Sequence, residues 1–347
     1  MPQVQELKGN IRVFCRVRPV AFSSSTPPSS LTPSTPSSCS LLTGAQISES
    51  EKQSGKKNAI HFDKIFSSDS SQEEVFEETA PLVVSVMDGY NICIFAYGQT
   101  GSGKTHTMEG RSEARGVNYR ALDMLFRLAL ERRTTMKYEF KVSLMEIYNE
   151  QLKDLLELHD SKGEMKRLDV KPDPSSSSTS STYVPDLKLV TVQDLEDVQR
   201  VIALGMKNRS TSSTQMNEQS SRSHCVFSVY VTCHDLLKGG NFFGKMHLID
   251  LAGSERLSRT GATGERLTEA KNINKSLSAL GNCVSALVAK SKHIPFRDSK
   301  LTHLLQDSLA GDAKVLMFVC SSPCDSDAPE TSCSLQFATR ARGVELG

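Results

Sequence analysis

A glycine-rich run, GQTGSGKT at residues 98–105, is the stretch of this sequence with the clearest chemistry. Its spacing fits G-x-x-x-x-G-K-[ST], in which glycines let consecutive backbone N–H groups face inward and bind phosphate oxygens. Lys104 is placed to reach the β- and γ-phosphates of a nucleotide, and the Thr105 hydroxyl is placed to bind Mg²⁺. An apolar run at residues 92–97 predicts the strand that precedes such a loop, and a helix start is expected after it. The sequence therefore predicts a nucleoside triphosphate site.

A second segment, NEQSSRSH at residues 217–224, is dense in hydroxyl groups and lies just before a strand-like run. Ser220 and Ser221 could bind the γ-phosphate and Mg²⁺, and Arg222 adds a cation beside them. Composition alone also fits an ordinary hydrophilic loop. The functional interpretation therefore depends on the phosphate-binding run.

A third segment, DLAGSE at residues 250–255, begins where an apolar strand is expected to end. In a P-loop protein, the carboxylate that orders Mg²⁺ lies at such a strand end, which makes Asp250 the candidate. Gly253 would let a backbone N–H approach a γ-phosphate. Arg222 and Glu255 carry opposite charges and are expected to pair across the site.

The base of the nucleotide is indicated by a missing motif. Proteins that read guanine with a P-loop carry N-K-x-D, and the nearest string here is Asn274-Lys275-Ser276-Leu277. Leucine stands where the acid should be, so GTP is disfavoured and ATP is the predicted nucleotide.

Strand-like and helix-like segments alternate along the chain, which favours a sheet with helices on both faces. The 347 residues are 38% hydrophobic, enough for a large core, and the net charge of +1 creates no global field toward nucleic acid or a membrane. The longest apolar runs are shorter than the roughly 18 residues of a spanning helix. Nine cysteines, mostly in apolar runs, indicate reduced thiols in the cytosol.

These segments are expected to form one large domain, because the distant candidate residues must converge on one site. Ser-rich stretches at residues 21–58 and 172–182 predict long surface loops. Strands are expected at residues 11–17, 60–66, 92–97, 138–148, 225–234, 245–252 and 313–321. Helices are expected after the capping box at residues 71–74 and at residues 120–133, 149–158, 191–208, 270–290, 299–309 and 330–342.

Six motifs together resemble the kinesin motor domain, and the match covers nearly the whole chain. They are FCRVRP (14–19), IFAYGQTGSGKTHTMEG (94–110), NEQSSRSH (217–224), LIDLAGSE (248–255), KNINKSLSALG (271–281) and HIPFRDSKLTHLLQDSL (293–309). The ends, ELKGNIRVFCRVRP and FATRARGVELG, look most like the C-terminal-motor kinesins. In that family the motor follows its coiled coil and moves toward the microtubule minus end. The resemblance implies an α/β fold of the P-loop NTPase class, with a central sheet of about eight strands and helices on both faces.

The resemblance also implies a role for each matching residue. Residues 217–224 look like the first switch of the family and residues 250–255 like the second switch. Arg16 and Pro19, with His106, look like the adenine pocket. The implied ATP-binding residues are Arg16, Arg18, Pro19, Gln99, Thr100, Gly101, Ser102, Gly103, Lys104, Thr105 and His106. The implied catalytic residues are Ser220, Ser221, Arg222, Gly253 and Glu255, and the implied Mg²⁺ ligands are Thr105, Ser221 and, through water, Asp250.

The implied partner is the acidic surface of microtubules, with Lys275, Arg297 and Lys300 as the contacts. The resemblance implies a microtubule-stimulated ATPase motor that uses ATP and Mg²⁺ and works on the cytoplasmic cytoskeleton, spindle microtubules included. Homodimerisation through an upstream coiled coil is expected, with residues 1–10 as the end of the neck, 11–342 as the motor and 343–347 as a tail. Nucleic acid and membranes are not expected partners. A tether or crosslinker with little motility remains the alternative, although the intact switch motifs argue against it.

Overall fold

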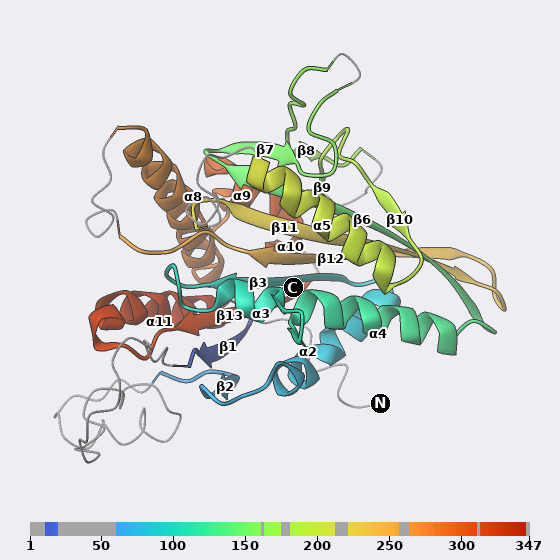
Figure 1. Cartoon of the computed structure of the whole chain (residues 1–347), viewed down its shortest axis with the longest axis horizontal. Helices are drawn as coiled ribbons and strands as arrows, with labels where there is room; N and C mark the ends of the chain where they lie inside the picture. The colour runs from blue at the N-terminus through green and yellow to red at the C-terminus, as the bar shows by residue number, and fades with distance from the viewer. Residues whose placement is uncertain are drawn as a thin grey trace.

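Strand β3 (Asn91–Tyr97), which leads into the glycine-rich loop, lies in the interior of the main sheet of this computed structural model. The structure describes residues 11–19, 60–160, 163–174, 181–211, 221–256, 264–310 and 313–344. The strand order is β10-β6-β11-β12-β3-β13-β1-β2, and β7 pairs with β6 outside this order (Figure 1). The other strands are β1 (Arg12–Val17), β2 (Lys64–Phe66), β6 (Met136–Tyr148), β7 (Gln151–Asp154), β10 (Val190–Val192), β11 (His224–Asp235), β12 (Asn241–Asp250) and β13 (Lys314–Ser321).

The sheet is mixed. Strand β3 runs parallel to both of its neighbours, β12 and β13, and β1 runs parallel to β13 and β2. Strand β11 is antiparallel to β12 and β6, and β10 is antiparallel to β6. Because β3 and β12 are parallel, the loops that follow them leave the same edge of the sheet. These loops hold the glycine-rich run and the second switch.

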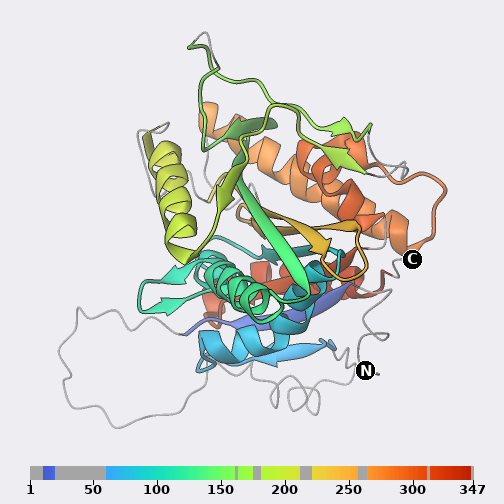
Figure 2. The same cartoon turned by 90° about the vertical axis from the view of Figure 1, so that its right-hand side faces the viewer.

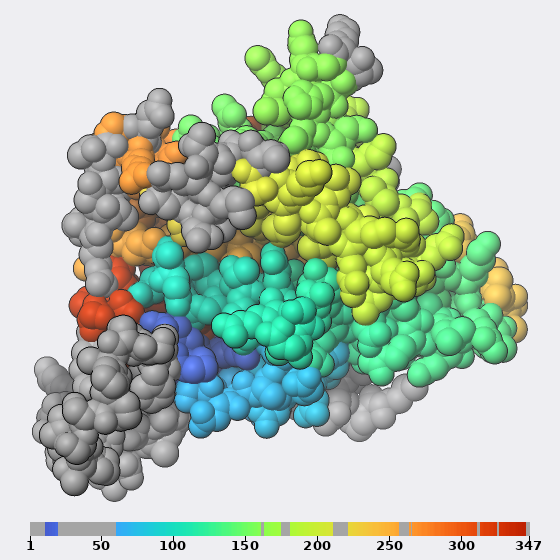
Figure 3. Space-filling view, viewed as in Figure 1, coloured from blue at the N-terminus to red at the C-terminus, as the bar shows by residue number. Residues whose placement is uncertain are grey.

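Helices cover both faces of the sheet, as the sequence predicted. Helices α2 (Gln72–Met87), α4 (Val117–Glu131) and α5 (Leu195–Thr211) pack on one face. Helices α8 (Glu265–Val288), α9 (Lys300–Leu304), α10 (Gln306–Leu309) and α11 (Ala328–Arg342) pack on the other. In the turned view, α5 (yellow) and α8 (orange) lie on opposite sides of the strands (Figure 2). In the space-filling view, α4 and α5 lie side by side and cover their face (Figure 3).

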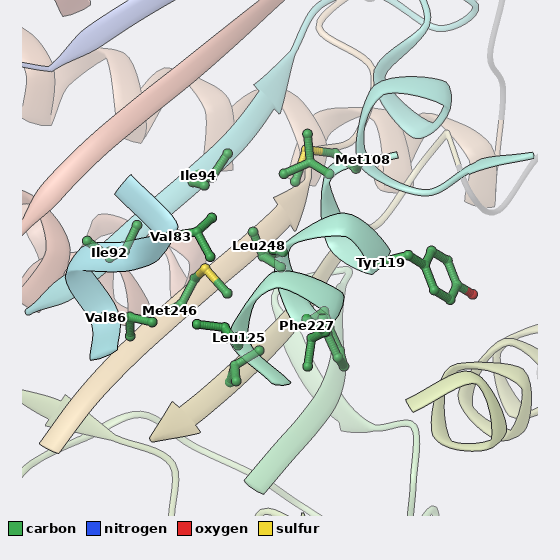
Figure 4. Close-up of a cluster of buried hydrophobic side chains, with 14 of the residues drawn as sticks. Val83, Val86, Ile92, Ile94, Met108, Tyr119, Leu125, Phe227, Met246 and Leu248 are labelled. Atoms are coloured by element: carbon green, nitrogen blue, oxygen red, sulfur yellow. The ribbon is translucent and has the colours of Figure 1, made fainter. Parts of the chain in front are cut away.

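Alternation along β3 produces the two cores. Ile92 and Ile94 join the cluster beneath α2 and α4, which Figure 4 shows together with Val83 and Leu125. The alternate side chains of the strand, Cys93 and Phe95, enter the second cluster beneath α8 and α11. A strand that is buried on both faces has a continuous apolar sequence, which is why residues 92–97 predicted a strand.

The capping box before α2 is confirmed. The Ser71 hydroxyl accepts the N–H of Glu74 at 3.1 Å, and the Glu74 carboxylate accepts the N–H of Ser71 at 3.0 Å. This exchange satisfies two N–H groups that a helix start would otherwise leave unbonded. The predicted start at this position is therefore correct.

The helix predicted at residues 149–158 is wrong. Strand β6 turns at Asn149 and Glu150 and returns as β7, with Ile147 paired to Leu152. Both turn residues have positive φ angles, 53° and 59°, as a two-residue hairpin turn of this kind requires. Asn is common at such a position but Glu is not, so the sequence carried only half of the usual turn signal.

The helix predicted from residue 191 begins later. Residues 190–192 form β10 on the edge of the sheet, and α5 starts at Leu195. The carboxylate of Asp194, rather than Thr191, caps it by accepting the Asp197 N–H at 2.8 Å. Thr191 pairs with Lys141 of β6, so pairing with the sheet takes this residue away from the helix.

Within the described ranges, no helix is both long enough and apolar enough to cross a bilayer. Several expected segments lie outside those ranges: the lead-in at residues 1–10, the loop at 21–58, most of the loop at 172–182 and the last three residues.

Short elements complete the fold. They are α3 (Lys104–Met108), the ribbons β4 (Gly110–Arg111) with β5 (Ala114–Arg115) and β8 (Lys171–Pro172) with β9 (Thr182–Tyr183), and the 3₁₀ turns η3 (Phe296–Asp298) and η4 (Asp325–Asp327).

Candidate functional site

The glycine-rich loop folds tightly between β3 and α3. A Cβ on Gly98 would lie 2.3 Å from the carbonyl oxygen of Cys320, so only glycine allows this close approach. The Lys104 ammonium donates to the carbonyl oxygens of Gly98 and Gln99, each at 2.9 Å. Burial lowers the pKa of Lys104, and the nearby Asp250 carboxylate partly offsets this effect. The ammonium is therefore held inside the loop, where a phosphate group would meet it.

Thr105 and Asp250, two of the predicted Mg²⁺ ligands, lie together beside this loop. The Thr105 hydroxyl donates to Asp250 Oδ2 at 2.5 Å. The other carboxylate oxygen of Asp250 and the Ser102 hydroxyl are buried without a hydrogen-bond partner in the described part of the chain. Burial raises the pKa of Asp250, while Lys104 and the Thr105 hydroxyl lower it. A hydroxyl beside an unsatisfied carboxylate oxygen fits Mg²⁺, which binds few protein groups and takes phosphate oxygens as further ligands.

Protein side chains alone do not form a complete metal site here. Among the residues that the structure describes, no group of three His, Cys, Asp or Glu side chains could hold a metal ion.

Arg16, which is expected in the adenine pocket, is bonded to other residues of the protein. It is buried, and its guanidinium donates to Gln72 Oε1 at 2.8 Å and to the Thr107 hydroxyl at 3.2 Å. The amide of Gln72 in turn donates to the carbonyl of His106 at 2.7 Å. Burial, together with the charges of Arg16 and Arg111, lowers the pKa of His106. Gln72 was missed by the sequence analysis, because an isolated glutamine at a helix start gives no signal.

Arg18 and Pro19 lie closer to the loop. A Cβ on Gly103 would be 3.6 Å from the Cβ of Arg18. The Arg18 guanidinium donates to the Ser322 hydroxyl at 3.1 Å and lies 3.8 Å from the Asp327 carboxylate. Pro19 is exposed. Arg18 therefore borders the loop from the side of β1.

Backbone hydrogen bonds join the first switch to the second switch, and the second switch to the glycine-rich loop. The Gly253 N–H donates to the carbonyl of Ser221 at 2.8 Å, and the Ser254 N–H donates to the carbonyl of Gly98 at 3.1 Å. A Cβ on Gly253 would lie 2.3 Å from both Thr100 Oγ1 and Glu255 Oε2. Ser220 lies outside the described residues. Three segments that are far apart in the sequence thus converge on one site.

The expected ion pair between Arg222 and Glu255 is not formed in this structure. Arg222 instead lies 3.1 Å from the carboxylate of Glu269 on α8. The Glu255 carboxylate accepts two hydrogen bonds from Thr100, from its N–H at 2.8 Å and from its hydroxyl at 2.6 Å. Arg222 and Glu255 thus each bind a different partner. The two hydrogen bonds from Thr100 hold Glu255 against the glycine-rich loop.

A buried ionic cluster lies behind the first switch. The Arg209 guanidinium of α5 lies 2.9 Å from the carboxylate of Glu146, which also accepts the Ser223 hydroxyl at 2.6 Å. Nearby, burial and the charge of Asp250 raise the pKa of Glu109 to about 7. Glu146 and Arg209 were not predicted from the sequence as site residues. An acid inside the apolar run of β6 was the available signal, because a buried carboxylate requires a partner.

Two of the three candidate microtubule contacts lie around one acid. The carboxylate of Glu150, in the β6–β7 turn, lies 3.7 Å from the Lys275 ammonium and accepts the backbone N–H of Lys300 at 3.3 Å. The Lys300 side chain pairs with Asp169 at 2.6 Å. Arg297 is exposed in η3. The structure thus places Lys275 and Lys300 on one surface formed by α8, α9 and the β6–β7 turn.

Comparison with known proteins agrees with this site. A family model described as the kinesin motor domain matches residues 16–344. Kinesin-like protein KIN-14R of Arabidopsis thaliana is 50% identical and KIN-14R of rice (Oryza sativa) 51% identical, each over 99% of this chain. The chain covers 31% and 33% of those two relatives, which is about a third of their length.

Solved structures give the same result. The motor domain of kinesin-like protein KAR3 of Saccharomyces cerevisiae is 36% identical, with a TM-score of 0.76 over 96% of this chain and 99% of that chain. The C-terminal motor and motor homology domain of Kar3Vik1, fused to a synthetic heterodimeric coiled coil, is 37% identical, with a TM-score of 0.80 over 98% of this chain and 86% of that chain. The chain belongs to the kinesin motor domain family.

Proposed function

We propose that this chain is a microtubule-stimulated ATPase and forms the motor part of a protein that moves toward the microtubule minus end. The observation that carries the proposal is the convergence of the glycine-rich loop with Ser221, Asp250 and Gly253. Phosphoryl transfer needs positioning and charge stabilisation, and this arrangement supplies both.

The residues of this chain would act on ATP mainly by binding and orientation. The loop N–H groups and Lys104 would hold the β- and γ-phosphates, while Arg16, Pro19 and His106 would form the adenine pocket, with Arg18 as a further ATP-binding residue. Thr105 and Ser221, together with Asp250 through water, would hold Mg²⁺, which neutralises charge on the phosphates when bound. Glu255 and Arg222 would close the site around the attacking water once each leaves its present partner.

The partner surface in this proposal consists of Lys275, Arg297 and Lys300. Their positive charges suit the acidic surface of tubulin, and local attraction of this kind speeds capture. Relatives named KIN-14 and the Kar3 structures support the minus-end direction. We propose that residues 11–342 form the motor, that residues 1–10 end a neck whose coiled coil joins two copies, and that the protein works on microtubules, including those of the spindle.

A turnover assay tests the proposal. Purified chain is given ATP and Mg²⁺ with increasing concentrations of taxol-stabilised microtubules, and phosphate release is followed. The expected result is a basal rate that rises many-fold and saturates. A rate that microtubules leave unchanged would contradict the proposal. Gliding of polarity-marked microtubules, driven by the chain fused to a dimeric coiled coil at its N-terminus, reports the direction.

A further inference from the structure

His224, the last residue of the first-switch segment, begins β11, and its ring lies between the second switch and α8. The residue is only 2% exposed. Its Nδ1 lies 3.0 Å from the backbone nitrogen of Ala252, and its Nε2 lies 2.8 Å from the hydroxyl oxygen of Ser276 on α8. One imidazole therefore contacts both elements at once.

These contacts determine where the proton on the ring lies. A backbone N–H can only donate, so Nδ1 accepts from Ala252 and the proton must be on Nε2. Nε2–H then donates to the Ser276 hydroxyl, whose own proton goes to the carbonyl of Ile273 at 2.8 Å. Burial, helped by the charges of Lys104 and Arg209, lowers the pKa of His224 to about 3. The ring is therefore neutral near pH 7, and each of its nitrogens is satisfied in this one orientation.

The connection extends from the nucleotide site to the candidate microtubule surface. Ala252 precedes Gly253, whose N–H is bonded to Ser221 of the first switch. Ser276 follows Lys275 on α8. A second contact between a switch and α8 is the Arg222–Glu269 pair, whose side chains are 27% and 19% exposed. Solvent weakens such a pair, whereas the hydrogen bonds of His224 lie in a dry environment, where they are stronger and more directional.

We infer that His224 is a positioning residue that couples the second switch to α8 through Ser276, so that microtubule contact at α8 is transmitted to the nucleotide site. This inference rests on the proposed function. A rigid ring that is bonded at both ends cannot follow Ala252 without either moving Ser276 or losing a hydrogen bond. Removing the Ser276 end should therefore uncouple microtubule binding from turnover while leaving the nucleotide site intact.

Ser276→Ala is the primary test, because it removes one hydroxyl and keeps the helix. Ser278→Ala is the matched control, since Ser278 lies two residues further along α8 and is exposed. In Ser276→Ala, the maximal microtubule-stimulated rate should fall about fivefold, the usual effect of one buried hydrogen bond. The basal rate and the microtubule concentration at half-maximal stimulation should stay within about twofold of the wild type. Ser278→Ala should match the wild type in all three.

His224→Asn provides a second, independent test. The Asn side-chain oxygen can replace Nδ1 as acceptor for Ala252, but the amide is too short to reach Ser276. The variant should therefore lose stimulation as Ser276→Ala does, and the double variant should be no worse than either single one.

Any of four results would overturn the coupling role. They are full stimulation in Ser276→Ala, an equal fall in its basal and stimulated rates, a matching fall in Ser278→Ala, and additive losses in the double variant. If the wild type shows no stimulation, the proposed function itself fails and the inference fails with it.

Discussion

Glu146→Ala should destabilise the protein strongly, because Glu146 binds both ends of the first-switch region. Its carboxylate is fully buried and accepts hydrogen bonds from Arg209, which precedes the first switch, and from Ser223 near the end of that switch. Removing one partner of a buried ion pair costs about 3–5 kcal/mol. At about 2.1 cal/mol/K per residue, the 347-residue chain has an unfolding entropy of roughly 0.7 kcal/mol/K, so Tm should fall by about 4–7 °C.

Glu146→Gln separates charge from hydrogen bonding. Its amide oxygen can still accept from Arg209 and Ser223, so only the charged component of the interaction is lost. That difference is about 1 kcal/mol, or roughly 1–2 °C in Tm. Glu157→Ala is the control, because Glu157 pairs with Lys166 and Lys188 at a side-chain exposure of 41%. Surface pairs of this kind contribute little.

Differential scanning calorimetry without nucleotide measures all three variants. The expected order of Tm loss is Glu146→Ala, then Glu146→Gln, then Glu157→Ala. If Glu146→Ala melted within about 1 °C of Glu157→Ala, the buried pair would not stabilise the fold and the reasoning would be refuted.

Three further predictions concern the site. Glu255→Ala should trap ATP and bind microtubules tightly, as measured by cosedimentation with ATP; unchanged affinity would instead favour a tether. Arg297→Ala and Lys300→Ala should each raise the microtubule concentration at half-maximal stimulation several-fold, most clearly at low salt, whereas Lys64→Ala should not. The pKa of Glu109 is raised from 4.5 to about 7, so the folded state binds the carboxyl proton more tightly than the unfolded state does. The contribution of this proton to the stability of the fold is therefore lost as pH rises toward 7. Glu109→Gln should therefore gain Tm relative to the wild type between pH 5.5 and 8, and parallel curves for the two proteins would contradict the shifted pKa.

Elements with strong local signals were predictable from the sequence. The capping box at Ser71 and Glu74 and the apolar run of β3 identified their elements because each depends on residues close in the chain. The hairpin at Asn149 and Glu150 was not predictable. Its second turn residue has a left-handed conformation that glutamate rarely adopts, and contacts with Lys275 and Lys300 stabilise it from distant parts of the chain.

The candidate site divides in the same way. Lys104, Thr105 and Asp250 were predictable, because a motif specifies both their types and their spacing, and the structure brings them together. Which partner Arg222 takes was not predictable. Both Glu255 and Glu269 carry the right charge, and the choice between them depends on the arrangement of α8. The role of Gln72 was not predictable either, because it depends on a hydrogen bond from Arg16, which lies 56 residues away in the sequence.

The position of β1 determines how the domain resists mechanical force. Ile11, just before β1, donates its N–H to the carbonyl of Val344 at 3.3 Å, so the two ends of the described chain lie side by side. Strand β1 lies between β13 and β2 and runs parallel to both. A pull on Ile11 along the strand axis loads the hydrogen bonds of β1 in shear, so that they share the force. The domain should therefore withstand tension at this attachment point far better than a domain whose terminal strand lies on the sheet edge and can be peeled away one bond at a time.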